Sequence, residues 1–135
     1  MCQSSIILVV GTTCTESGKD AEFNQWYNDV HIPEVLKVPG MISATRYENM
    51  EPDKDSPCFL AIYELENEEA VKKFKNHMRR QRNKEIPDFI WGPKFDVKTF
   101  KPYRRIARQV DSHESPEYTS TASKIPLPGA ISSVG

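Results

Sequence analysis

One histidine and one tyrosine, placed one helical turn apart, are the residues of this sequence best suited to chemistry. If the stretch from Asp20 is helical, His31 follows Tyr27 by four residues and shares its face. An imidazole has an ordinary pKa of about 6.5, so it can exchange protons near neutral pH. A phenol one turn away can donate a hydrogen bond to the imidazole or to a bound molecule. His31 and Tyr27 are therefore the candidate catalytic residues.

The helix that carries these two residues is predicted to be amphipathic. Its apolar row follows the i, i+3, i+4, i+7 pattern and consists of Phe23, Trp26, Tyr27 and Val30. Because Ile32 precedes Pro33, the helix is expected to end or bend there. A nearby helix C-terminus would raise the pKa of His31, whereas burial against aromatic rings would lower it. The sequence leaves open which effect dominates.

The rest of the chain is predicted to form four strands and one more helix. One strand precedes the first helix and the other three follow it. Residues 4–10 predict the first strand, and residues 41–48 and 58–65 predict the next two. Asn67 is suited to cap a helix whose inward row is Ala70, Val71, Phe74, His77 and Met78. Alternation from Phe95 predicts a last strand that ends near residues 100–103. The order βαββαβ predicts an α+β protein with a ferredoxin-like antiparallel sheet and helices on one face.

This plan has consequences for assembly and for domain boundaries. Helices on only one side leave the other sheet face with its own apolar residues, and two copies laid sheet to sheet would bury them, so a homodimer is expected. Residues 1–103 are predicted to form the domain. Residues 104–135, rich in Ser, Thr and Pro, are either a disordered tail or an arm that lies across a neighbour. An arm would dock through Ile106, Val110, Ile125 and Leu127.

Charge and hydropathy exclude several classes of partner. The 18 basic and 19 acidic residues give a formal net charge of −1, so no nucleic-acid or membrane partner is expected. The basic cluster Arg79, Arg80, Arg82 and Lys84 lies where a helix should end, and there it can be a solvated face or a binding site. The apolar run at residues 6–10 is too short for a signal-peptide core or a membrane span. A cytoplasmic location is therefore expected.

The three cysteines do not suggest a disulfide framework or a metal site. Cys2, Cys14 and Cys58 are odd in number, form no C-x-x-C pair and have no metal-like spacing to the histidines. A reducing, intracellular setting fits them best. Cys14 and Cys58 are expected to be small buried hydrophobes or loop thiols. No metal and no cofactor is predicted.

A longer motif surrounds the candidate catalytic pair. It reads W-Y-x-x-x-H-x-P-x-x-L-x-x-P-G and comprises Trp26, Tyr27, His31, Pro33, Leu36, Pro39 and Gly40. With the βαββαβ order, this block resembles the dimeric α+β barrel superfamily, most closely its EthD-like members. The resemblance implies two ferredoxin-like subunits whose sheets close a barrel, with a ligand cleft in each subunit between sheet and helices. Similar chains act as cofactor-free monooxygenases, polyketide cyclases, decarboxylases, dehydratases and haem-linked enzymes, and others have no known activity, so the fold does not name a reaction.

Seven further residues are candidates for binding a small apolar or aromatic ligand, and each has a structural alternative. They are Trp26, Tyr47, Tyr63, His77, Phe89, Trp91 and Phe95. Trp26 is expected to be a packing residue, and a lone histidine on an apolar face such as His77 is more often a satisfied core residue. The three aromatic residues around Gly92 can line a ligand pocket or plug the end of the barrel. Tyr47 and Tyr63 share a cleft only if the strand register allows it, because a slip of one residue turns a side chain to the other face.

Two functions from different classes follow. The first is a cofactor-independent enzyme on a small aromatic or polyketide-like molecule, with His31 as general base or acid and Tyr27 bound to a substrate oxygen. Cyclisation, dehydration, decarboxylation and isomerisation fit this pair, and monooxygenation is a sub-case. The second is a non-catalytic, stress-associated accessory protein that holds a hydrophobic ligand, with His31 as a structural residue at the helix end. A haem-linked role with His31 or His77 as axial ligand is a third, weaker possibility.

Overall fold

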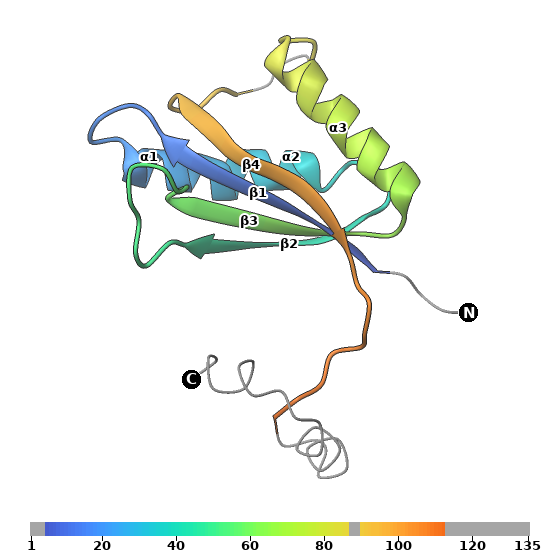
Figure 1. Cartoon of the computed structure of the whole chain (residues 1–135). Helices are drawn as coiled ribbons and strands as arrows, with labels where there is room; N and C mark the ends of the chain where they lie inside the picture. Colours follow the sequence, from blue (N-terminus) through green and yellow to red (C-terminus); the bar gives the residue numbers. More distant parts are fainter. Residues whose placement is uncertain (1–4, 87–89, 113–135) are drawn as a thin grey trace.

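A four-stranded antiparallel sheet with helices on one face forms the fold (Figure 1). The computed structural model describes residues 5–86 and 90–112. In chain order the elements are β1 (Ile6–Cys14), α1 (Asp20–Trp26), the π-helix η1 (Tyr27–His31), α2 (Ile32–Val35), β2 (Met41–Glu48), β3 (Phe59–Leu65), α3 (Glu68–Arg82) and β4 (Phe95–Arg104). The strands lie in the order β2-β3-β1-β4. This arrangement confirms the predicted α+β, ferredoxin-like plan.

Strand β1 runs through the middle of the sheet and is longer than its apolar run. It pairs with β3 on one side and β4 on the other. The apolar residues end at Val10, and the strand was therefore predicted to stop there. It continues through Gly11 to Cys14 because these residues pair with β4, with a bulge between Gly11 and Thr12. Pairing with β4 throughout, and with β3 as far as Thr12, extends the strand beyond what its own composition favours.

Helix α3 packs as its periodicity predicts. The side chain of Asn67 caps it by accepting a hydrogen bond from the Ala70 N–H at 2.9 Å. Ala70, Val71 and Phe74 are buried. Phe74 stacks on Phe100 of β4 with ring centres 5.8 Å apart. The helix is thereby fixed over the sheet.

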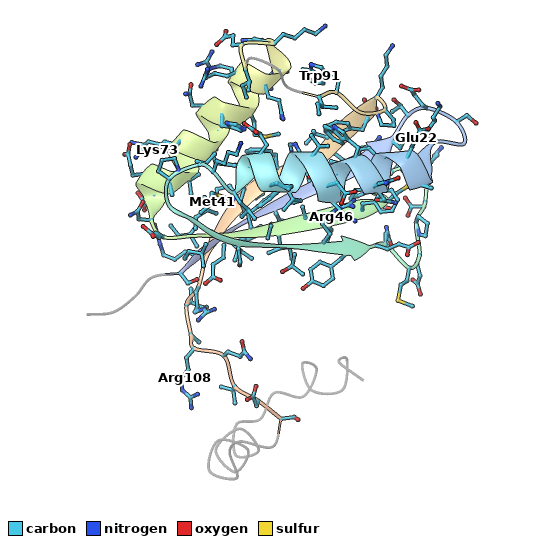
Figure 2. The ribbon with its side chains drawn as sticks, turned by 180° about the vertical axis from the view of Figure 1, so that it is seen from behind. Glu22, Met41, Arg46, Lys73, Trp91 and Arg108 are labelled. Carbon is cyan, nitrogen blue, oxygen red and sulfur yellow. The ribbon has the colours of Figure 1, made fainter. Side chains whose placement is uncertain are left out.

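All the helices lie on one face of the sheet. In Figure 2, the helical segment from α1 to α2 runs in front of the strands, and α3 lies next to its end at the upper left. Register places Ile7, Val9, Leu60 and Ile62 on the opposite face, since they alternate with the buried residues of β1 and β3. No described helix covers these residues, and each remains partly exposed. The expected uncovered apolar face is present in the described part of the chain.

The chain beyond β4 was predicted to be a tail or an arm. Ile106 is almost fully exposed, and Val110 is also exposed. Ile125 and Leu127 lie outside the described residues. Within the described ranges, none of the helices has the length and apolar character needed to span a membrane.

Candidate functional site

The helix that carries the candidate pair does not end at Ile32. It widens into the π-helix η1, in which the Ile32 N–H donates to the carbonyl of Tyr27, five residues back. In a straight α-helix the ring of Pro33 would clash with the carbonyl four residues earlier, that of Asp29. A wider turn relieves this clash, and Pro33 lies in the first turn of α2, where its missing N–H is not needed. Single π turns inside helices are frequent at functional sites.

The π turn directs Tyr27 and His31 into an aromatic cluster. The His31 ring stacks on Trp26 with ring centres 5.2 Å apart, and Tyr27 meets it edge-on at 4.6 Å. The indole N–H of Trp26 donates to the carbonyl of Ile90 at 2.7 Å. With its polar atom bonded and its ring buried, Trp26 has the position of a packing residue.

His31 is a neutral side chain inside this cluster. It is 1% exposed, and its Nδ1 lies 3.3 Å from Nε2 of Gln81 on α3. Because the Gln81 amide nitrogen can only donate, Nδ1 accepts and the ring proton is on Nε2. Burial lowers the pKa of His31 to about 3, with smaller contributions from His77 and Arg46. Burial therefore outweighs the helix-end effect, and the imidazole does not exchange protons near neutral pH as expected from its ordinary pKa.

Tyr27 forms a buried hydroxyl pair with Tyr63 of β3. The two oxygens are 3.2 Å apart. Burial raises the pKa of Tyr27, and it raises the pKa of Tyr63 well above its ordinary value, so both phenols stay protonated. One hydroxyl donates to the other, so the contact between them uses one of the two O–H protons. Both side chains are almost fully buried, and neither lines the two pockets described below. The sequence placed Tyr63 among the ligand-binding residues, and the structure brings it to the candidate catalytic tyrosine.

Arg46 lies beside this pair and was not identified from the sequence. Its guanidinium carbon is 4.1 Å from the centre of the Tyr27 ring, and Nη1 donates to Oδ1 of Asn28 at 3.0 Å. Burial lowers its pKa, although an arginine stays charged throughout the normal pH range. Strand alternation from Ala44 places Arg46 on the helix-facing side of β2. A charged residue at an inward-facing strand position was the feature of the sequence that could have identified Arg46 as a site residue.

Gln81 was also missed. Its side chain is buried in the last turn of α3 and bonds to His31. It follows Phe74 by seven residues, so it continues the inward row of the helix. A polar residue on that row, opposite a predicted inward histidine, was the signal for this contact.

A pocket of about 330 Å³ lies between the α1–η1 segment and β2. The residues that line it are Asp20, Asn24, Asn28, Arg46, Tyr47, Glu48 and Phe59. Two of them carry buried polar atoms with no hydrogen-bond partner among the described residues, namely Nε and Nη2 of Arg46 and Oδ1 of Asn24. This pocket and the tyrosine pair share Arg46, which contacts both.

Tyr47 and Tyr63 lie on opposite faces of the sheet. Tyr63 pairs with Ala44 and is buried beneath the helices, whereas Tyr47 pairs with Leu60 and is half-exposed. The strand register, which the sequence left open, therefore does not let the two tyrosines share a cleft. Tyr47 lies on the same face as Leu60, and Leu60 and Tyr63 are three residues apart on β3, which puts them on opposite faces.

His77 lines a groove that does not include Tyr27 or Tyr63. The groove has a volume of about 340 Å³ and is lined by His77 with Glu34, Lys37, Val38, Pro39, Lys73, Asn76, Arg80 and Ile86. Burial lowers the pKa of His77. Its Nε2 is buried without a partner among the described residues.

The three aromatic residues around Gly92 have different positions. Phe95 packs into the aromatic cluster, 5.2 Å from Phe23 between ring centres. Trp91 is half-exposed, with the Lys84 ammonium 6.0 Å from its ring centre. Phe89 lies outside the described residues.

The described residues do not fit a haem or a metal ion. No group of three or more His, Cys, Asp or Glu side chains within residues 5–86 and 90–112 can hold a metal. An axial ligand needs an imidazole nitrogen open to the porphyrin, and His31 is buried against Trp26 and Tyr27. His77 faces a groove lined by charged side chains, which do not suit the apolar macrocycle.

The comparisons with solved structures identify the same fold. A proposed monooxygenase from Shewanella loihica PV-4 matches with a TM-score of 0.54 and 14% identity over 81% of this chain and 100% of its own. A dimeric ferredoxin-like protein from an uncultured marine organism matches with a TM-score of 0.55 and 10% identity over 79% and 99% of the two chains. A dabb family protein from Mesorhizobium loti, with a ferredoxin-like fold, matches with a TM-score of 0.50 and 16% identity over 79% of this chain and 100% of its own. At these identities the similarity establishes the fold alone.

The sequence comparisons give a family but no characterised relative. None of the curated proteins matches this chain. The resemblance to dimeric α+β barrel proteins that the motif indicated is confirmed by the structural neighbours. The model of the domain of unknown function DUF4286 matches residues 5–91, more than half of the sequence, and the chain therefore belongs to the DUF4286 family.

Proposed function

We propose that this chain is a homodimeric enzyme that acts on a small apolar, aromatic or polyketide-like molecule at the Tyr27–Tyr63 pair. The observation that carries the proposal is the buried hydroxyl pair itself, which has one O–H proton left to donate. Hydroxyls in an aromatic core are costly to bury unless they are hydrogen-bonded, and the contact between these two uses only one of their two O–H protons. A proposed monooxygenase among the proteins of this fold supports an enzymatic role.

The geometry favours hydrogen-bond donation over removal of a proton by His31. A donor aimed at a carbonyl oxygen stabilises the negative charge that develops there during cyclisation, dehydration or decarboxylation. The hydroxyl pair supplies that donor, since both phenols stay protonated. His31, whose pKa is about 3, is a weak base, and its Nε2–H is a second donor held in place by Gln81.

Two observations support the homodimer. One sheet face carries partly exposed apolar residues that no described helix covers. A protein of the same fold is described as dimeric. Two copies packed through this face would enclose each subunit's sheet, as the dimeric α+β barrel arrangement requires.

The proposal is tested by turnover of the molecule that co-purifies with the chain, identified by native mass spectrometry. Removing one oxyanion donor typically lowers kcat by about 10²–10³-fold. We expect that loss in Tyr27→Phe and in Tyr63→Phe. Tyr103→Phe is the matched control for loss of a phenol hydroxyl, because Tyr103 is half-exposed on β4. Since Tyr103 pairs with Ile7 of the uncovered sheet face, the mass of this variant in solution is measured alongside turnover to confirm that the assembly is unchanged. Wild-type turnover by both buried-site variants with an intact fold contradicts the assignment.

A second candidate function is a non-catalytic dimer that holds a hydrophobic ligand. The observation in its favour is the bond from Gln81 to a neutral, fully buried His31, which is the arrangement of a structural residue. In that case His31→Ala lowers thermal stability and leaves ligand affinity nearly unchanged. If His31→Ala instead loses turnover while its thermal stability is unchanged, the result supports the enzyme and contradicts the non-catalytic dimer.

A further inference from the structure

Arg46 has an uncompensated positive charge next to the proposed site. No ion pair joins it to a carboxylate among residues 5–86 and 90–112. Asp20 and Glu48 line the same pocket, but both are exposed to solvent, where their charges are screened. The guanidinium instead lies over the rings of Tyr27 and Phe59, with centre distances of 4.1 and 5.5 Å. This placement keeps the charge beside the aromatic cluster without neutralising it.

The unused donors of Arg46 are on one edge of the guanidinium. Nη1 is occupied by Asn28 Oδ1, whereas Nε and Nη2 are buried and have no partner among the described residues. The N–H bonds of Nε and Nη2 point in parallel from that edge, and they match the two oxygens of a carboxylate. A buried charged donor without a partner is unfavourable, so this edge is a place where a ligand oxyanion would be bound strongly.

Asn24 adds a second unpaired group in the same pocket. Its Oδ1 is buried without a partner and is an acceptor. Oδ1 therefore suits a hydroxyl or N–H group of the ligand. Donors on Arg46 and an acceptor on Asn24 together describe a ligand with an acidic group and a hydrogen-bond donor.

We propose that the Nε–Nη2 edge of Arg46 binds a carboxylate of the ligand, which makes the ligand an aryl carboxylate. The placement of the aromatic ring rests on the proposed function. Arg46 is then the residue that determines specificity for the acid over its neutral analogue. A phosphate is the other oxyanion that such an edge can hold, and the experiment separates the two.

The test is isothermal titration calorimetry of the full chain with matched probes. The acids are benzoate, 2-naphthoate and anthraquinone-2-carboxylate, and each is compared with its hydroxymethyl analogue. Phenyl phosphate tests the alternative anion. Hydrogen bonds to a charged group correspond to about a 10- to 100-fold change in affinity, and we expect the best-fitting acid to bind tighter than its alcohol by that factor.

Three variants assign the effect to Arg46. Arg46→Met is expected to remove the preference for the acid. Arg46→Lys keeps the charge but loses the paired donors, so it should retain only part of the preference. Arg82→Met is the control, because Arg82 is an exposed arginine at the end of α3. Far-UV circular dichroism confirms that each variant is folded.

Each outcome decides the proposal. Equal affinity of acids and alcohols, or an unchanged preference in Arg46→Met, overturns the carboxylate assignment and leaves the proposed function standing. Tighter binding of phenyl phosphate than of benzoate reassigns the edge to a phosphate and also overturns it. Absence of binding by every aromatic probe contradicts both the carboxylate and the aromatic ligand of the proposed function.

Discussion

Burial makes His31 a pH-dependent contributor to stability. Its pKa in the folded protein is about 3, below the ordinary value of 6.5. Between those values the unfolded chain binds a proton that the folded chain does not, so this contribution to stability falls as the pH drops from 6.5 towards 3. One such proton changes the free energy of unfolding by about 1.4 kcal/mol per pH unit.

The first prediction follows for the variant His31→Gln. Between pH 7.5 and pH 5.0 we expect His31 to account for a loss of about 2 kcal/mol in the wild type, and this part should be absent in the variant. Urea unfolding at the two pH values measures it. His77→Gln is the comparison variant. It should remove a smaller part of the pH-dependent loss in the free energy of unfolding, because His77 is only partly buried. Parallel pH profiles of wild type and His31→Gln would show that His31 titrates normally.

The second prediction concerns the buried hydroxyl pair. Tyr27→Phe or Tyr63→Phe leaves one buried hydroxyl without its partner, and we expect each to reduce the free energy of unfolding by about 1–2 kcal/mol. The double variant removes both hydroxyls, so its loss in the free energy of unfolding should be smaller than the sum of the losses in the two single variants. A double-mutant cycle by chemical denaturation measures this coupling. Strict additivity would mean that the 3.2 Å contact contributes nothing to stability.

At the scale of elements, the turn before β2 depends on a glycine that meets α3. Gly40 has a φ of +92°, and a Cβ there would lie 2.4 Å from the Cβ of Ala70. Gly18 has a φ of +74°, but apart from its own chain neighbours no described residue has a heavy atom within 4 Å of the position of its Cβ. The two glycines therefore share a left-handed backbone and differ in the space around them.

The third prediction uses this difference. Gly18→Ala should lower the free energy of unfolding by about 1–2 kcal/mol, which is the strain of the left-handed backbone. Gly40→Ala carries the same strain and must also displace α3, so we expect a further loss of about 1–3 kcal/mol. Thermal or chemical unfolding of the two variants measures the gap. Equal losses would indicate that α3 moves away without resistance.

At the scale of the whole molecule, the proposed homodimer can be tested at the sheet face that it would bury. Ile62 lies on the sheet face that no described helix covers, and two copies packed through that face would bury it. A lysine there would place a charge in an apolar interface, where it has no partner. Met50, 92% exposed in the loop between β2 and β3, offers the matched apolar-to-lysine substitution.

The fourth prediction is that the wild type has about twice the 15.5 kDa mass of the chain in solution. Ile62→Lys should convert it to a monomer, and Met50→Lys should leave the dimer intact. Multi-angle light scattering at several concentrations measures both. A monomeric wild type at tens of micromolar would remove the homodimer from the proposed function.

The sequence by itself determined the order of elements and most of their bounds. Strand β2 occupies the predicted residues 41–48, and Asn67 caps α3 as expected, because alternation and capping are local properties of the chain. The inward positions of Tyr27 and His31 also follow from local periodicity.

Tertiary structure decided what those inward residues meet. Strand register turned Tyr47 away from Tyr63, and it placed Arg46 over the Tyr27 ring. The approach of α3 brought Gln81 to His31, and the closed core lowered the pKa of that histidine to about 3. These features depend on contacts between residues distant in sequence and on exclusion of water, and no local pattern encodes either.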